Sequence, residues 1–370
     1  MPGRVLGCPD VKYGGGTVAS TRFGSWNMQS VQFAAKSDLP RWTYLLISSQ
    51  GSPDPWGGSA ELKPSLDAFR DTLRGLGIKA ADCIQGLRIS VNPDDAEAKI
   101  DEAVHQFSSS RNPPALLLVI LPSDDATIYN LVKCACDVKE GLLNVCVVAK
   151  KFAQAKVQYL ANVALKVNLK LGGRNQYLDK AKLGILSEGK TMVVGIDVTH
   201  PSPGSSPGAP SVAGVVASVD GWLAQWPADL RIQAARQEMV SGLDGLLKSR
   251  LQLWMRHNGA YPDNILVCRD GVSEGQYGLV LDQELPQLRS ACRDVYPAES
   301  TKRGLPRLTV LIVGKRHNTR FYPAKKEDAD RSSNLPNGTV VDRGVTEARN
   351  WDFFLQAHAA IQGTARPAHY

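Results

Sequence analysis

The chain has 370 residues, of which 43% are hydrophobic, so it is long enough for two domains with packed cores. Its 43 Lys and Arg exceed its 36 Asp and Glu, and the formal charge of +7 favours a polyanionic partner without requiring one. The N-terminus shows no signal peptide, and no uncharged apolar run reaches the roughly 18 residues that a membrane span needs, so we expect no membrane partner.

The seven cysteines predict free thiols in a reducing, cytoplasmic environment, because their number is odd and several lie in apolar, strand-like runs. Cys134 and Cys136 are two positions apart, but no second Cys or His pair follows at the spacing of a zinc site. We therefore do not expect a structural zinc ion.

The first half of the chain predicts a linker followed by an α/β domain. Residues 1–38 are rich in Gly, Ser and isolated aromatics and predict a linker segment. The predicted strands are 42–48, 115–121 and 145–148, and the predicted helices are 60–76, 94–107, 125–138 and 152–165. This alternation is typical of a parallel sheet covered by helices. Leu171 and two glycines mark a boundary, so we assign the first domain to residues 39–175.

Residues 176–370 predict a second domain of a different kind. Its predicted strands are 192–197, 211–219, 265–268 and 308–313, and its predicted helices are 230–256 and 275–295. Consecutive antiparallel strands, then a helix, then a strand that ends in Asp are typical of a ribonuclease-H-like fold.

Two aspartates follow runs of apolar, mostly β-branched residues that predict buried strands. They are Asp197 and Asp270. A turn or a strand-end cap would also explain either of them. Two carboxylates on adjacent strands repel each other unless a cation holds both, so together they favour a divalent metal site. Glu238 is a candidate third acid, although alone it would be interpreted as a solvated charge on a helix or at the bend before it.

Four sequence motifs occur in series in the second half of the chain: GIDVTHP (195–201), RDGVSEGQY (269–277), KRHNTRF (315–321) and HAAIQGTARPAHY (358–370). Together they resemble the PIWI domain of eukaryotic Argonaute proteins, and the insertions resemble those of fungal members. The resemblance implies a Rossmann-like MID domain before the ribonuclease-H-like PIWI domain, and VKYGGG (11–16) resembles the end of the preceding linker.

The resemblance implies an RNA-guided endoribonuclease, or slicer, with two Mg²⁺ (or Mn²⁺) ions. Asp197 and Asp270 match the aspartates that bridge the metals, and Glu238 matches the glutamate that completes the site. The family's fourth ligand is a histidine beyond the segment in which this sequence stops, so we expect the chain to cleave weakly or not at all. A guide-binding silencing module without catalysis is the alternative, and a different nuclease of the ribonuclease-H fold is a weaker one.

The resemblance also implies a pocket for the 5′ phosphate of a small guide RNA. The matching residues are Tyr129, Lys133, Lys166 and Lys170. Lys133 is expected in the first turns of its helix, where the helix dipole favours an anion. The loop that senses the first guide base matches Ser123, Asp124, Asp125, Ala126 and Thr127. Lysines four apart are more often simply solvated, so spacing alone would not define this pocket.

Five basic residues match those that contact the guide backbone in the family: Lys315, Arg316, Arg320, His358 and Arg366. Such side chains give affinity that does not depend on sequence, as any guide requires. A complementary target RNA is the other expected nucleic-acid partner. Silencing proteins that bind tryptophan pockets are further candidates, but the residues that would form these pockets are too scattered in the sequence to assign.

Overall fold

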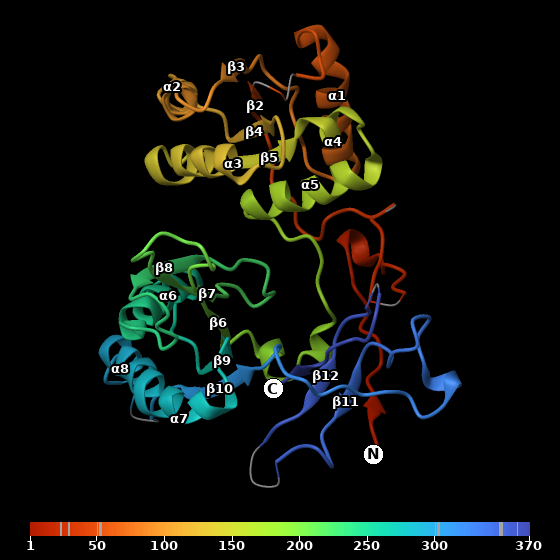
Figure 1. The fold of residues 1–370 in the computed structure, drawn as a ribbon, viewed down its shortest axis with the longest axis vertical. Helices are drawn as coiled ribbons and strands as arrows, with labels where there is room; N and C mark the ends of the chain where they lie inside the picture. The colour runs from red at the N-terminus through yellow and green to blue at the C-terminus, as the bar shows by residue number, and fades with distance from the viewer. Residues whose placement is uncertain are drawn as a thin grey trace. The chain divides into compact units, whose positions relative to one another are not determined.

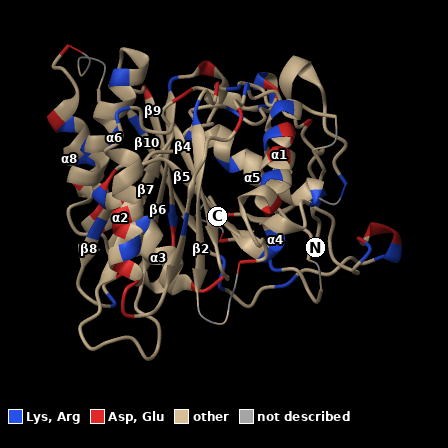
Figure 2. Cartoon of the chain, turned by 90° about the horizontal axis from the view of Figure 1, so that it is seen from above, with Lys and Arg blue, Asp and Glu red and all other residues tan. Residues whose placement is uncertain are grey.

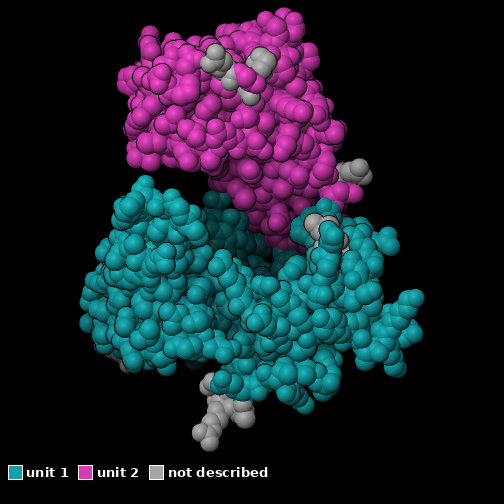
Figure 3. Space-filling model, in the orientation of Figure 1, with its two compact units in different colours: residues 1–10, 20–26, 178–370 teal, residues 11–19, 27–177 magenta. Residues whose placement is uncertain are grey.

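The fold is described from a computed structural model, shown in Figure 1. The structure describes residues 1–22, 24–28, 30–49, 51, 54–299, 301, 304–347, 351–360 and 362–370. It consists of two compact units, coloured separately in Figure 3. Unit 1 comprises Met1–Asp10, Ser20–Trp26 and Leu178–Tyr370, and unit 2 comprises Val11–Ala19 and Asn27–Tyr177. The first 38 residues are thus divided between the two units.

Unit 2 is built on a parallel sheet with the strand order β3-β2-β4-β5. The strands are β2 (Trp42–Ser49), β3 (Leu87–Val91), β4 (Leu116–Leu121) and β5 (Asn144–Val148). All residues of β4 are buried, which is typical of a central strand covered on both faces. The order reverses between β2 and β4, so the loops after these strands border the crevice in which such sheets bind ligands.

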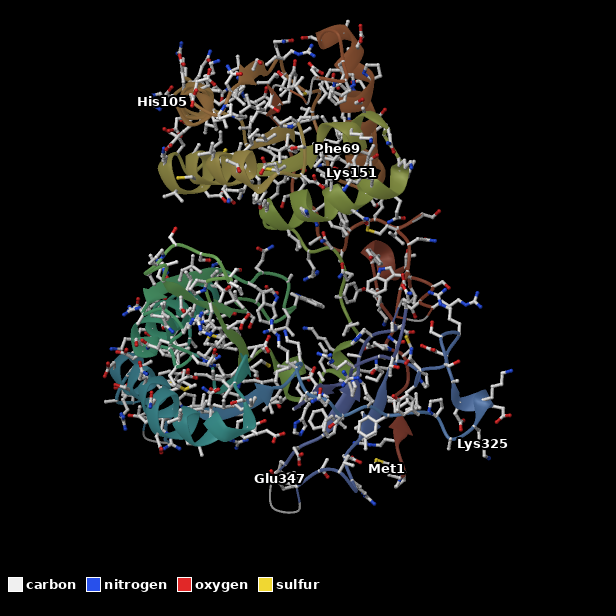
Figure 4. All side chains as sticks on the ribbon, viewed as in Figure 1. Met1, Phe69, His105, Lys151, Lys325 and Glu347 are labelled. Carbon is white, nitrogen blue, oxygen red and sulfur yellow. The ribbon has the colours of Figure 1, made fainter. Side chains whose placement is uncertain are left out.

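Helices cover both faces of this sheet, as a Rossmann-like fold requires. They are α1 (Ser59–Gly75), α2 (Ala96–Ser108), α3 (Ala126–Lys133), α4 (Ala149–Ala153) and α5 (Val157–Lys170). Apolar residues of α2 and α3 form a core with the sheet. Another cluster joins Trp42, Phe69 and Phe152 edge to face, with ring centroids 5.8 Å and 6.0 Å apart (Phe69 is labelled in Figure 4). The outer faces of α1 and α2 carry charges of both signs (Figure 2).

Unit 1 contains a sheet with the order β10-β9-β6-β7-β8. The strands are β6 (Thr191–Thr199), β7 (Ser211–Ala217), β8 (Ala228–Gln233), β9 (Asn264–Asp270) and β10 (Arg307–Val313). β6, β7 and β8 form an antiparallel meander, and β9 and β10 add in parallel beside β6. Helices α6 (Leu243–Asn258) and α8 (Leu285–Val295) pack on one face of the sheet through a shared apolar core. The arrangement confirms the ribonuclease-H-like fold.

The remainder of unit 1 contains a second sheet made of short strands. Its order is β1-β11-β12-β13, and all its pairings are antiparallel. The strands are β1 (Arg4–Val5), β11 (Thr339–Val341), β12 (Phe354–Gln356) and β13 (Ala368–His369). A bridge between Gly314 and His369 connects this sheet to the end of β10.

Four predicted helices differ from the observed elements. The segment predicted as one helix over 230–256 begins as β8, in which Leu230 and Ile232 are exposed, and the helix begins only after Gly242 in the left-handed region (φ 64°). The predicted helix 152–165 is two helices, α4 and α5, separated by Ala155 with a positive φ. The predicted helix 125–138 is α3 continued by a π-helical turn over Cys134–Lys139.

The predicted helix 275–295 is a composite. A 3-10 turn (Glu274–Gln276) and the short α7 (Tyr277–Leu279) lead into a π-helical turn (Val280–Glu284) and then α8. The widening at the π-helical turn brings Glu284 into the interior, where it is 1% exposed. Among the residues that the structure describes, no helix is long and apolar enough to span a bilayer. All seven cysteines are free thiols.

We predict that Gly86→Ala destabilises unit 2. A Cβ at Gly86 would lie 2.1 Å from the backbone oxygen of Tyr44 in β2, so the strand before β3 must shift. We expect a loss of roughly 1–3 kcal/mol in the free energy of unfolding, measured by urea denaturation. Gly75→Ala is the matched control, because nothing lies within 4 Å of its Cβ position, and it should be neutral or slightly stabilising. Equal effects of the two substitutions would contradict this account.

Candidate functional site

The two aspartates lie side by side on adjacent parallel strands. Ile196 of β6 is in register with Arg269 of β9, so Asp197 and Asp270 occupy neighbouring positions one residue further on. Both side chains lie on the face of the sheet opposite to Ile196 and Arg269, because successive residues of a strand alternate. β6 continues to Thr199, so the prediction that Asp197 ends its strand was wrong, whereas Asp270 is the last residue of β9.

Glu238, in the loop between β8 and α6, directs its carboxylate towards the two aspartates. Gly271, which follows β9, has a φ of +89°, and a Cβ on it would lie 3.0 Å from Oε1 of Glu238 and 3.5 Å from Oδ1 of Asp197. The carboxylates of Glu238 and Asp197 therefore both approach Gly271. A side chain at this position would be strained and would crowd Glu238, so the glycine allows the acids to converge.

Two basic side chains hold the Glu238 carboxylate from opposite ends. His200, which follows β6, places Nε2 2.8 Å from Oε2 of Glu238, and its Nδ1 lies 2.8 Å from the hydroxyl of Ser211. Arg269 donates from one terminal nitrogen to Oε1 of Glu238 at 2.9 Å and from the other to the backbone oxygen of Glu238 at 2.7 Å. Both the side chain and the backbone of Glu238 are thereby fixed.

Arg269 is a fully buried cation, and Glu284 is its main partner. The guanidinium is 0% exposed and donates to both carboxylate oxygens of Glu284 at 2.9–3.2 Å. Burial lowers the pKa of Arg269, but the hydrogen bonds and charges of Glu284 and Glu238 outweigh burial and raise it. The sequence did hold a signal for this cation: Ile265, Val267 and Arg269 alternate along β9, which places a charge on the buried face.

The three candidate metal-binding acids line a pocket of about 750 Å³ in unit 1. Asp197, Glu238 and Asp270 share its lining with Lys315 and Arg316, which follow β10. The Lys315 ammonium forms an ion pair with Asp270, and this hydrogen bond raises the pKa of the lysine. The pocket therefore presents both an acidic floor and basic groups suited to phosphate.

The side chains of Asp197, Glu238 and Asp270 are of the type that binds divalent metals, but their oxygens do not converge on one position where an ion could bind. Carboxylate oxygens are the ligands that Mg²⁺ prefers, and Asp197 and Glu238 both direct an oxygen towards Gly271. Within the described ranges, no three or more His, Cys, Asp or Glu residues are grouped so that they could hold a metal ion. Asp270 is paired with Lys315 and Glu238 with Arg269, so cationic side chains neutralise two of the three acids in this arrangement.

The five predicted guide-contacting residues do not all lie together. Lys315 and Arg316 line the pocket of the acids, whereas Arg320, His358 and Arg366 are not among its lining residues. Arg320 donates to the backbone oxygens of His317 and Thr319, which ties it to its own loop. His358 and Arg366 are exposed in the segment around β12 and β13.

In unit 2, two of the predicted lysines meet at Asn144, the first residue of β5. The Lys133 ammonium donates to the side-chain oxygen of Asn144 at 3.0 Å, and Lys170 donates to its backbone oxygen at 2.7 Å. Asn144 is buried and also donates to Asp137, which forms an ion pair with Lys133. The roles of Asn144 and Asp137 were not anticipated from the sequence, because they depend on the contact between α3 and β5.

The two lysines at Asn144 repel each other, and Asp137 reduces this repulsion in part. Burial and the positive charge of Lys133 lower the pKa of Lys170. Burial also acts to lower the pKa of Lys133, but the hydrogen bond and charge of Asp137 more than offset this and raise it. Lys166 is exposed on α5, and its charge acts with the other two lysines on the buried thiol of Cys146. Two lysines therefore meet at Asn144, where Asp137 neutralises only part of their charge.

The expectation that Lys133 lies in the first turns of its helix was wrong. α3 begins at Ala126, which places the half-exposed Tyr129 in the first turn and Lys133 at the last residue. Lys170 is likewise the last residue of α5. Lys170 therefore lies at a helix carboxyl end, where the backbone dipole repels an anion, whereas Lys133 lies in the middle of a helical segment that the π-helical turn extends to Lys139. Neither lysine has the help of a helix amino end, so the lysine charges must attract the anion.

The predicted base-sensing loop lies at the other end of α3. Ser123, Asp124 and Asp125 lie between β4 and α3, and Ala126 and Thr127 are the first residues of α3, beside the point where the strand order reverses. Asp125 caps α3 by accepting a hydrogen bond from the backbone of Thr127 at 2.8 Å. Asp124 and the residues after it are exposed, so this loop is accessible from solvent.

The protein thus has a ribonuclease-H-like sheet, with acids from two neighbouring strands and a loop beside it. The comparison with known families is specific: the Piwi domain matches residues 116–370. The chain belongs to the Argonaute family of Piwi-domain proteins. It is 34% identical to protein argonaute 1B of Oryza sativa subsp. japonica over 99% of this chain and 34% of that protein, and 33% identical to protein argonaute 5 of Arabidopsis thaliana over 99% and 37%. The chain thus spans about a third of the length of these relatives.

Solved structures agree with this assignment and with the order of the two domains. The C-terminal lobe of a budding yeast Argonaute matches with a TM-score of 0.85 and 27% identity over 100% of this chain and 78% of that one. The MID–PIWI domains of N. crassa QDE-2 match with a TM-score of 0.64 and 38% identity over 76% of each chain. Kluyveromyces polysporus Argonaute with a guide RNA matches with a TM-score of 0.84 and 27% identity over 99% and 46%. The fold is a Rossmann-like MID domain followed by a ribonuclease-H-like PIWI domain.

We predict that Lys315→Met tightens the binding of Mn²⁺ to the protein by up to about fivefold. The Lys315 side chain is 61% exposed, and ion pairs as exposed as this contribute at most about 1 kcal/mol, which sets the size of the competition at Asp270. The dissociation constant can be measured by titration calorimetry. Lys326→Met, which removes an exposed lysine outside the pocket, is the control and should leave it unchanged. Weaker or unaltered binding in Lys315→Met would refute the competition.

Proposed function

We propose that this protein acts in small-RNA-guided silencing as a slicer. Residues 1–38 would be the linker before MID, residues 39–175 the MID domain that binds the guide 5′ phosphate, and residues 176–370 the PIWI domain that cleaves complementary RNA. The observation that carries the proposal is the shared pocket of Asp197, Glu238 and Asp270 with Lys315 and Arg316 on a ribonuclease-H-like sheet. The acids suit a metal, and the basic residues suit the phosphates of a polynucleotide.

Further observations support the proposed RNA partner, the proposed origin of the chain and its proposed location in the cell. The likeness to K. polysporus Argonaute with a guide RNA favours a guide RNA as the partner, and the 38% identity to N. crassa QDE-2 favours a fungal MID–PIWI portion of a longer protein. The seven free thiols are consistent with a cytoplasmic location. Silencing proteins that bind the surface of PIWI are proposed as further partners through the family likeness alone.

In this proposal, Asp197 and Asp270 would hold two Mg²⁺ (or Mn²⁺) ions, and Glu238 would complete their shell. A divalent metal held by these acids would make a water molecule a better nucleophile and would stabilise negative charge on the leaving oxygen. Arg269 and His200 keep the Glu238 carboxylate in the pocket. Lys315 must move from Asp270, and it can then neutralise a phosphate of the guide or target.

The alternative is a guide-binding silencing module without catalysis. One observation favours it: Asp270 is paired with Lys315, so a metal ligand is occupied by a side chain of the protein. The two functions share the 5′-phosphate pocket and differ only in whether the acids cleave RNA. They are therefore separated by tests of guide binding and of cleavage on the same preparation.

For guide binding, we predict that Lys133→Ala weakens the affinity for a 5′-phosphorylated RNA by roughly tenfold to a hundredfold, the usual range for a lost charge-assisted hydrogen bond. Lys166→Ala should act in the same direction. The affinity for the same RNA with a 5′ hydroxyl should change much less, since the lysines act on the phosphate. Fluorescence anisotropy measures both constants.

Lys79→Ala is the matched control in the same unit, because the side chain of this lysine is highly exposed and its ion pair with Asp38 is long, at 3.9 Å. It should affect both RNAs equally and little. Equal losses for the phosphorylated and hydroxylated RNA in Lys133→Ala would show that the lysines do not form a phosphate pocket.

For cleavage, we predict that Mg²⁺-dependent cutting of a complementary RNA by the guide-loaded protein falls at least about a hundredfold in Asp197→Asn, since loss of a metal ligand removes several kcal/mol of transition-state stabilisation. Asp328→Asn, at an exposed acid outside the pocket, should retain the full rate. Cleavage is measured under single-turnover conditions on a labelled target. Tight guide binding without any cleavage by the unsubstituted protein would favour the non-catalytic module, and undiminished cleavage by Asp197→Asn would rule out the proposed site.

A further inference from the structure

The loop that carries Glu238 is held by side chains that take no part in the proposed metal site. Val240, two residues after Glu238, donates its backbone N–H to Oε1 of Glu284 at 2.9 Å. The backbone oxygen of Val240 accepts from the side chain of Gln287 at 3.1 Å, and the N–H of Leu243 donates to Gln287 at 2.8 Å. Three backbone groups of one short segment thus depend on two residues at the start of α8.

Glu284 also acts on the Glu238 side chain through Arg269. Because Nε and one terminal nitrogen of Arg269 bind Glu284, the other terminal nitrogen is left to face the carboxylate of Glu238. A guanidinium is rigid and planar, so the position of Glu284 fixes the direction in which that last donor points. Glu284 therefore reaches Glu238 by two routes, one through the loop backbone and one through the cation.

Because Glu284 and Arg269 are both buried, their relative geometry is tightly constrained. Glu284 is 1% exposed and Arg269 is 0% exposed, and a buried ion pair requires a good geometry to offset its desolvation. Met239, between Glu238 and Val240, packs with Val280 in a small apolar cluster one turn before Glu284. The apolar contact and the hydrogen bonds thus hold the same loop to the same helix.

We propose that Glu284 and Gln287 are positioning residues that keep the Glu238 loop in the conformation that places its carboxylate beside Asp197. The assignment rests on the proposed function, in which Glu238 is the third acid of the metal site. Neither residue lines the pocket, so each acts through the loop and not on the RNA or the metal. A change in α8 is thereby transmitted to the active site without any contact with the substrate.

The test is amide hydrogen exchange of the protein without RNA or metal, compared between residues 238–243 and strand β6. Gln287→Leu removes two backbone contacts of the loop at similar volume, and Glu284→Gln removes the charge that orients Arg269 while an amide oxygen remains for Val240. We expect exchange in the loop to rise roughly tenfold or more relative to β6 in both variants, as the loss of such hydrogen bonds implies.

Leu288→Ala is the control for general destabilisation, because Leu288 lies on the same helix, is 1% exposed and packs in the main core of unit 1. It should raise exchange in the loop and in β6 together and leave their ratio unchanged. If Gln287→Leu and Glu284→Gln give that same pattern, the two residues are structural only and the proposal fails. If Glu284→Gln does not fold, Gln287→Leu still decides. Because the readout uses no RNA, failure to cleave does not bear on it.

Discussion

A guanidinium without access to water organises the ribonuclease-H-like part of unit 1. Arg269 lies on the buried face of β9, and its charge can remain there only because Glu284 and Glu238 accept its hydrogen bonds. The strand, the helix that follows it and the loop before α6 must therefore keep one relative arrangement. Removing one partner would leave an unpaired charge in the interior, which commonly costs about 3–5 kcal/mol.

This constraint also explains how one acid can be supplied by a loop. Asp197 and Asp270 are placed by strand register, which changes little once the sheet forms. Glu238 has no strand to place it, and its position follows from bonds to Arg269, His200 and the start of α8. The site thus combines two rigid acids with one whose position depends on side-chain chemistry at a distance.

Sequence patterns predicted the interior strands but not the contacts that position the acids. The strands β4, β6 and β9 were predicted because each is a run of apolar residues buried in a sheet. β8 was assigned to a helix because its exposed edge position leaves a mixed pattern with Leu230 and Ile232 at the surface. The sheet of β1, β11, β12 and β13 has strands of two or three residues, too short for any period to be seen.

For the sites, motifs supplied the acids and the lysines, but the partners could be seen only in three dimensions. Glu284 is 15 residues from Arg269 in sequence, and Asn144 is 11 residues from Lys133. Nothing local indicates either pairing, since each depends on how a helix packs on a strand. The position of Lys133 along its helix was another such fact: the residue lies in the middle of the helical segment, so the helix dipole gives it no help in binding an anion.

The proximity of Lys133 and Lys170 has a consequence for folding. Without a bound anion, their two ammonium groups are held close to one another at Asn144, a repulsion that the unfolded chain does not have. An anion that binds between them relieves this repulsion only in the folded state, so it stabilises the fold in proportion to the logarithm of its concentration above the dissociation constant. Anion binding and the thermal stability of unit 2 are thus linked, and the protein without a bound anion unfolds and is degraded more readily.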